Sequence, residues 1–74
     1  MDFVCWVQSE EGYEALYYAG ELILSQSESM VFEDVRSVVE GKRAILLFGR
    51  CHAVGFKGFP LRLRDVRFLE RGLV

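Results

Sequence analysis

The residues best suited to chemistry lie in one glycine-rich stretch, residues 49–60, with the sequence GRCHAVGFKGFP. It holds two cations, Arg50 and Lys57, and the single histidine of the chain, His52. Backbone amides beside glycines can form a nest for an anion, arginine can bind a phosphate through two hydrogen bonds, and lysine adds a point charge. The stretch therefore predicts an anion-binding loop, although its spacing matches neither a P-loop nor a dinucleotide-binding fingerprint.

The aromatic and basic residues around this loop have two interpretations. Phe56 and Phe59 can stack on a base, or they can anchor an ordinary loop to the core. Arg62 and Arg64 follow directly and begin a series of arginines that would form a basic ridge or a solvated surface. The sequence thus predicts, as one alternative, a binder of an anionic small molecule such as a phosphorylated metabolite or nucleotide.

Patterns for catalysis or metal binding are weak. The two cysteines, Cys5 and Cys51, have no Cys-x-x-Cys spacing, so we interpret them as buried thiols rather than metal ligands. Cys51 and His52 are adjacent, and adjacent residues of a strand point to opposite faces, which argues against a catalytic pair. Because a chain of 74 residues also struggles to enclose a catalytic pocket, we expect a non-enzymatic protein without metal or cofactor.

Formal charge is divided between the two halves of the chain. Residues 1–35 hold eight acidic residues and no lysine or arginine, whereas residues 36–74 hold nine basic and three acidic residues. The net charge of −2 argues against general nucleic-acid binding, because domains with that function are usually basic overall. The division predicts a basic face that attracts an anion, a polar molecule that self-associates, or halves that interleave and neutralise one another.

The apolar content suggests a partner. Apolar residues make up 51% of the chain, so either the core is dense or a second subunit covers part of the surface. On the second interpretation the protein is a homo-oligomer, a dimer, that also binds a protein partner, with Trp6, Tyr17 and Tyr18 as candidate interface residues. The longest apolar runs have five residues and the N-terminus has no basic leader, so we expect a cytoplasmic protein outside the membrane.

The first part of the chain predicts three strands. Residues 3–7 are β-branched and aromatic, and residues 13–19 and 22–25 follow a polar turn and a Gly20-Glu21 turn, respectively. Glycine tolerates the positive φ that such a two-residue turn needs at its first position. These segments predict an antiparallel meander.

The middle of the chain predicts a helix and a fourth strand. The valines of residues 30–40 recur at the spacing of one helix face, with Ser29 as N-cap and Gly41 as the left-handed residue after the helix. Residues 43–48 are continuously apolar after the first, which predicts a central strand covered on both sides and ended by Gly49.

The rest of the chain is less regular. Most of residues 49–60 is predicted to be a loop, with a hairpin that turns at Gly49-Arg50 as the alternative. Residues 61–67 predict a short helix after Pro60. We therefore expect one α+β domain over residues 1–74, in the order β-β-β-α-β. Its mainly antiparallel sheet carries one amphipathic helix on one face, and a short helical turn follows near the C-terminus.

Overall fold

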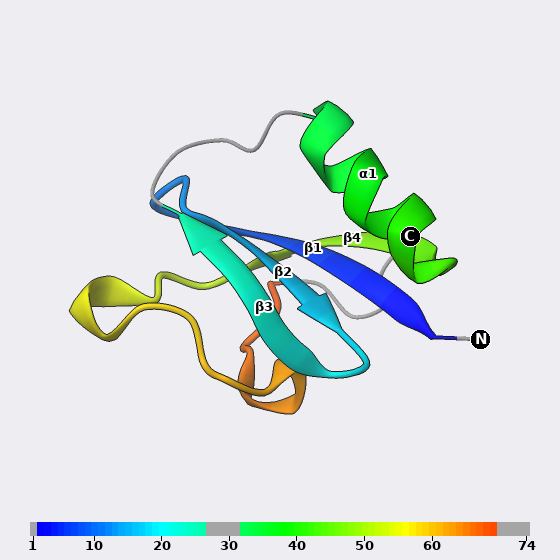
Figure 1. Cartoon of the computed structure of the whole chain (residues 1–74). Helices are drawn as coiled ribbons and strands as arrows, with labels where there is room; N and C mark the ends of the chain where they lie inside the picture. The colour runs from blue at the N-terminus through cyan, green and yellow to red at the C-terminus, as the bar shows by residue number, and fades with distance from the viewer. Residues whose placement is uncertain (1, 27–31, 70–74) are drawn as a thin grey trace.

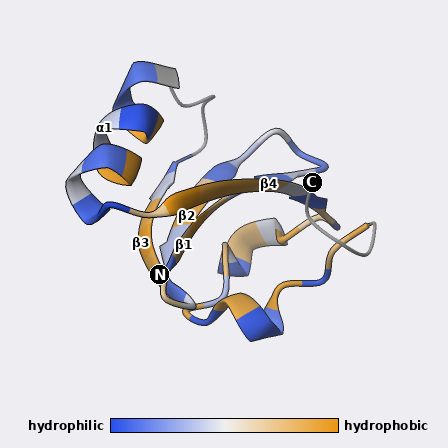
Figure 2. Ribbon diagram, turned by 90° about the vertical axis from the view of Figure 1, so that its right-hand side faces the viewer, coloured by the Kyte–Doolittle hydropathy of each residue, from blue (hydrophilic) through white to orange (hydrophobic). Residues whose placement is uncertain are grey.

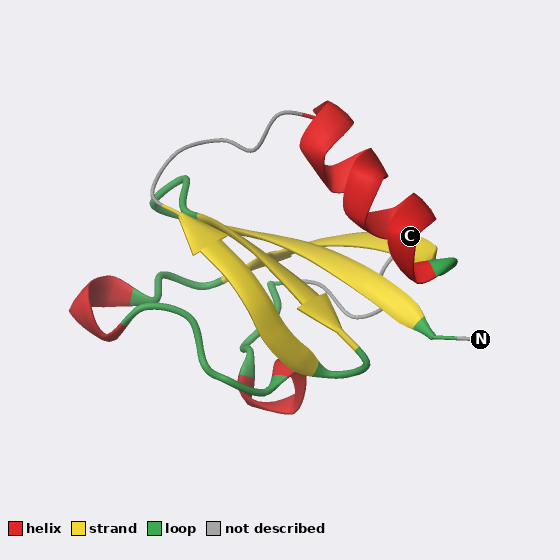
Figure 3. Cartoon of the chain, in the orientation of Figure 1, coloured by secondary structure: helices red, strands yellow, loops and turns green. Residues whose placement is uncertain are grey.

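The computed structural model describes residues 2–26 and 32–69 of the chain (Figure 1). They form strands and one helix, coloured in Figure 3, with these bounds: β1 (Phe3–Ser9), β2 (Glu14–Tyr18), β3 (Glu21–Gln26), α1 (Phe32–Lys42) and β4 (Ile45–Cys51). Two short 3-10 turns follow, at Gly55–Lys57 and Leu63–Asp65. The predicted α+β fold is confirmed.

The four strands form one sheet in the order β3-β2-β1-β4. β1 and β3 each pair antiparallel with β2, while β4 pairs parallel with β1. The parallel pair arises because α1 carries the chain from β3 across the sheet to the far side of β1, as parallel strands need a long crossover. The sheet is thus mixed, with two of its three pairings antiparallel.

β4 lies at an edge of the sheet, which corrects the prediction of a central strand. Its side chains point alternately to the two faces, so that Leu46 packs on the helix-side core and Cys51 lies in the opposite core, while Ile45 and Phe48 stay exposed. The strand also does not end at Gly49. Gly49 pairs with Val7 in the parallel ladder, and pairing continues to Cys51 despite the low strand propensity of glycine.

The turn between β2 and β3 consists of Ala19 and Gly20, not the predicted Gly20 and Glu21. Ala19 has a φ of 51° and Gly20 a φ of 83°. Positive φ at both positions defines a type I′ turn, whose twist matches that of the flanking strands. β2 therefore ends at Tyr18, one residue earlier than predicted.

α1 is followed by a left-handed residue, but that residue is Arg43, with a φ of 51°, and Gly41 lies inside the helix. The amides of Arg43 and Ala44 each donate to a carbonyl of the last turn at 3.1 Å, as in a Schellman motif. The predicted N-cap Ser29 and the predicted helix start at residues 30–31 lie outside the described residues.

Segments cover both faces of the sheet (Figure 2), and each face has its own core. On one face Val35 of α1 is fully buried against Val4 of β1 and Leu16 of β2. The opposite face buries a second cluster, which consists of Cys5, Val7, Ala15, Tyr17 and Cys51.

Residues 52–69, called the strap below, cover this second face and reach both edges of the sheet. At the edge of β3 the amide of Leu22 donates to the carbonyl of Leu61 at 2.9 Å. At the edge of β4 the amide of Leu69 donates to the carbonyl of Arg50, also at 2.9 Å. Hydrogen bonds therefore hold the strap at both edges of the sheet.

The predicted short helical turn near the C-terminus is present in the strap, but it is shorter than the predicted segment. Residues 61–67 form no helix beyond the 3-10 turn Leu63–Asp65, because the segments on either side pair with the sheet edges. Most of residues 49–60 is loop, as predicted, and no hairpin forms there. Their first three residues complete β4, and the remainder passes through the 3-10 turn Gly55–Lys57.

Candidate functional site

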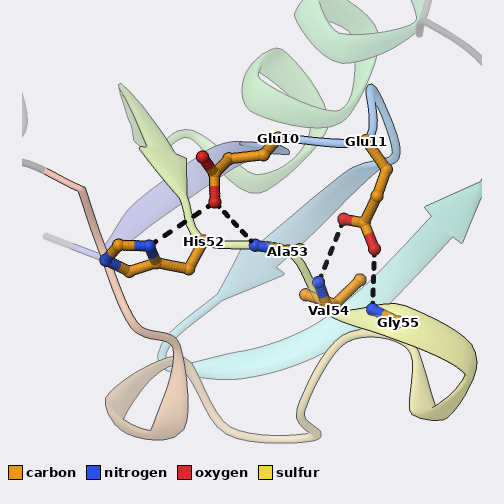
Figure 4. Close-up of polar contacts among 6 residues, drawn as sticks. All are labelled: Glu10, Glu11, His52, Ala53, Val54 and Gly55. Atoms are coloured by element: carbon orange, nitrogen blue, oxygen red, sulfur yellow. Dashed lines mark hydrogen bonds and ion pairs between the residues drawn. The ribbon is translucent and has the colours of Figure 1, made fainter.

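A carboxylate from the turn between β1 and β2 holds the start of the strap (Figure 4). The two carboxylate oxygens of Glu11 accept hydrogen bonds from the amides of Val54, at 3.0 Å, and Gly55, at 2.7 Å. These bonds, the one from Gly55 foremost, lower the pKa of the Glu11 carboxyl below its usual range although the side chain is exposed. Glu11 therefore fixes the backbone that enters the 3-10 turn.

The neighbouring Glu10 binds the strap in the same way. Its Oε1 atom accepts a hydrogen bond from the amide of Ala53 at 3.1 Å and lies 3.5 Å from Nδ1 of His52. Consecutive amides of the predicted anion nest thus converge on two carboxylates of the chain itself. The amides expected to bind an external anion are therefore already bound to two carboxylates of the chain.

A cleft of about 500 Å³ is formed by the strap and the end of β4. Its apolar lining includes Val54, Phe59 and Val66, which also pack against the core below. The volume lies within the range of sites that hold small ligands or partner side chains.

The predicted anion-binding residues do not all converge on this cleft. His52 and Lys57 line it, together with Arg67 and Asp65. The other three predicted cations, Arg50, Arg62 and Arg64, are exposed and lie outside its lining. Arg67 was predicted as a member of the arginine series and not of the anion-binding loop, because its place in the cleft depends on the pairing of residues 67–69 with the end of β4.

The two phenylalanines of the strap have opposite environments. Phe59 is half-buried, packs against the core and lines the cleft, as predicted for an anchor. Phe56 is fully exposed on the 3-10 turn. Gly55, the first residue of this turn, and Gly58, which follows it, have φ of 66° and 72°, values that favour glycine. The turn therefore presents an aromatic ring to solvent.

The predicted interface residues lie in or near the two cores. Tyr17 is fully buried and donates its hydroxyl to the carbonyl of Pro60 at 2.7 Å, and burial raises its pKa well above the usual range. It is therefore a core residue without surface for a partner, because it faces the strap. Trp6 and Tyr18 are half-buried on the helix side, and Trp6 donates to Glu14 at 2.8 Å.

The cysteines are buried free thiols. Burial raises the pKa of Cys5 to about 11, and burial followed by the charges of Glu11 and Glu10 raises that of Cys51. A thiol with a raised pKa is a poor nucleophile. Among the described residues, no cluster of three His, Cys, Asp or Glu side chains is placed to hold a metal ion.

The acidic and basic parts of the chain make few direct ion pairs. Over residues 2–26 and 32–69, the ion pairs are Arg36 with Glu40 inside α1, at 3.0 Å, and His52 with Glu10. The end of β4 and the strap, residues 50–69, carry five basic residues and one acidic residue, all exposed. Within the described residues, the arginines and the lysine of this part form no ion pair with a carboxylate.

The exposed ring of Phe56 and part of the cleft lining, residues 57–61, belong to one segment of the strap, which Glu11 and Tyr17 hold at its two ends. None of the helices in the described part of the chain is long and apolar enough to cross a membrane. Comparison with models of protein families, with curated proteins and with solved structures finds no match.

Proposed function

We propose that the chain is a small non-enzymatic interaction module that associates with itself and binds a protein partner. The observation that supports the partner site best is the fully exposed ring of Phe56. Burying such a side chain is worth roughly 1.5–3 kcal/mol, and the fold gains none of this from Phe56. Aromatic side chains are enriched in protein interfaces, where a partner buries them.

The turn that carries Phe56 is ordered before any partner arrives. Glu11 holds the amides of Val54 and Gly55, and the hydroxyl of Tyr17 holds the carbonyl of Pro60. A preorganised site loses less conformational entropy on binding, so more of the contact energy appears as affinity.

The cleft extends the same surface. Lys57, next to Phe56 in the turn, lines the cleft, and Leu61 at its other end is 78% exposed. A partner can therefore bury the ring of Phe56 while one of its own side chains enters the cleft. Such a central apolar contact with a charged rim is typical of protein interfaces.

Site-specific photo-crosslinking in cells tests this proposal. A photoreactive phenylalanine derivative replaces Phe56, and in the matched control it replaces Ile23, which is exposed on β3. We expect position 56 to crosslink to one defined protein that position 23 does not reach. The purified partner must then bind the unmodified chain. If no crosslink is specific to position 56, the partner site is not there.

An anionic small molecule is the second candidate ligand. Lys57 and Arg67 line the cleft and form no ion pair within residues 2–26 and 32–69. Calorimetric titration with nucleotides and phosphorylated sugars at low salt tests this alternative, because screening weakens such contacts at high salt. Binding lost in Lys57→Gln but kept in Arg36→Gln, a change on the distant helix, would favour it.

The proposal includes a cytoplasmic location. Cys5 and Cys51 are free and buried in the same core cluster, and reduced cysteines are usual in that compartment. Fractionation of cells that express the tagged chain tests the location, and the chain is expected in the soluble cytoplasmic fraction.

A further inference from the structure

The two edges of the sheet differ in how they are protected against pairing. The edge strand β3 contains a register irregularity where it passes Leu16 and Tyr17. It ends in the polar residues Ser25 and Gln26, and the strap pairs with its beginning at Leu22. Bulges, polar residues and covering segments are the means by which proteins prevent edge-to-edge association.

The edge strand β4 lacks these features over residues 45–49. This stretch, ILLFG, is uncharged and stays in continuous register with β1. Ile45 and Phe48 are 45% and 39% exposed. The strap pairs with β4 only at its end, opposite Cys51, and no other described segment lies along the outer side of the strand.

The backbone of this stretch has hydrogen-bonding groups directed outward. The amide of Ile45 donates inward to the carbonyl of Asp2, whereas the carbonyl of Arg50 accepts from the strap on the outer side. Because backbone groups alternate along a strand, Leu46 and Phe48 share the outward direction of Arg50. They therefore present a row of donors and acceptors at an apolar edge.

We propose that the β4 edge pairs with the β4 edge of a second copy, antiparallel about a two-fold axis at Leu47. This inference rests on the self-association in the proposed function and names its surface. In this register Leu46 pairs with Phe48 of the second copy, and the reverse, and each pair exchanges two hydrogen bonds. The paired stretch contains no charge, and the same edge serves both copies, so the assembly closes as a dimer with one continuous sheet.

The test is sedimentation velocity of the full chain over a concentration series. Phe48→Lys puts a charge on the β4 edge without removing a backbone group of the β1–β4 ladder. Leu24→Lys is the matched control, because Leu24 is 42% exposed on the other edge strand. We expect the unmodified chain and Leu24→Lys to dimerise with similar affinity, and Phe48→Lys to dissociate at least tenfold more readily.

Amide hydrogen exchange of the unmodified chain supplies an independent readout. The amides of Leu46 and Phe48 are expected to become protected as the dimer forms. A dimer that survives Phe48→Lys would overturn the β4 edge as its surface but leave self-association standing. A strict monomer at all concentrations, with these amides exposed or covered from within the chain, would overturn both and leave the partner site at Phe56 unaffected.

Discussion

The two faces of the sheet are covered by different kinds of structure. On one face α1 satisfies most of its backbone groups internally and contributes Val35 to the core. On the other, the strap contains only two short 3-10 turns, and its backbone bonds to groups distant in sequence. The Glu11 carboxylate and the Tyr17 hydroxyl reach across 43 or 44 positions to do so. The conformation of the helix is therefore determined by local sequence, whereas the conformation of the strap is determined by hydrogen bonds to the completed sheet.

This difference extends to the surface that each face presents. The helix uses its apolar stripe to cover the sheet, as amphipathic helices do. The strap buries Phe59 but leaves Phe56 in solvent. An irregular segment that is fixed by residues distant in sequence can expose a side chain that does not pack in the core. Substitutions on each face therefore measure how much that face contributes to the stability of the fold.

The largest expected effect is on the strap side. Tyr17→Ala should destabilise the fold by about 4 kcal/mol, because it removes a fully buried aromatic ring and leaves a cavity. Val35→Ala, a smaller truncation under the helix, should cost about 2 kcal/mol. Urea unfolding followed by circular dichroism measures both. If Val35→Ala proved the more damaging, the strap-side core would not be the main source of stability.

A milder change isolates the contact between the sheet and the strap. Tyr17→Phe keeps the ring and removes the hydroxyl that bonds to Pro60. It should cost about 1 kcal/mol, the usual net value of one hydrogen bond. A loss as large as that of Tyr17→Ala in the same unfolding experiment would mean that the hydroxyl, not the ring, holds the strap.

On the helix side, two changes at the C-terminal end of α1 should stabilise. Arg43→Gly relieves a left-handed residue, and Gly41→Ala improves helix propensity at a position where an added Cβ meets nothing within 4 Å. Each should add about 1 kcal/mol to the free energy of unfolding. Thermal unfolding measures the gain. Destabilisation by Gly41→Ala would indicate that Gly41, as first predicted, terminates the helix.

The smallest global effect is expected from Glu11→Gln, because the side chain is exposed, but its local effect should be clear. The amides of Val54 and Gly55 should exchange faster, while those of α1 are unchanged. The folded-state pKa of Glu11 is lowered, so its contribution is present above the unfolded pKa and is lost as pH falls through the folded value. The stability difference from the unmodified chain should therefore vanish in acid. A stability difference that persisted or grew in acid would contradict a stabilising role for the hydrogen bonds between the Glu11 carboxylate and the amides of Val54 and Gly55.

The contrast between the faces also explains which features the sequence predicted. The meander and the helix follow from local patterns, namely the β-branched and aromatic residues and turn residues of the meander and the recurring valines of α1. The positions of the left-handed residues were missed, because Ala19 and Arg43 are forced there by the strand register and the helix length rather than by their own propensity.

The candidate site was predicted in part. The composition of residues 49–60 indicated an anion nest, but not that Glu10 and Glu11 fill it, since they lie about forty positions away. The exposure of Phe56 beside a buried Phe59 depends on the path of the strap over the sheet. No short-range pattern specifies that path.

The most direct test of the account is the affinity of the partner captured at position 56, measured by calorimetry for Phe56→Ser and for Ile23→Ser. Both residues are exposed, one on the strap and one on β3. We predict that Phe56→Ser weakens binding at least tenfold, about 1.4 kcal/mol, with an unchanged melting temperature, and that Ile23→Ser binds normally. Equal affinity for Phe56→Ser and the unmodified chain would contradict the proposal that the strap is the binding face.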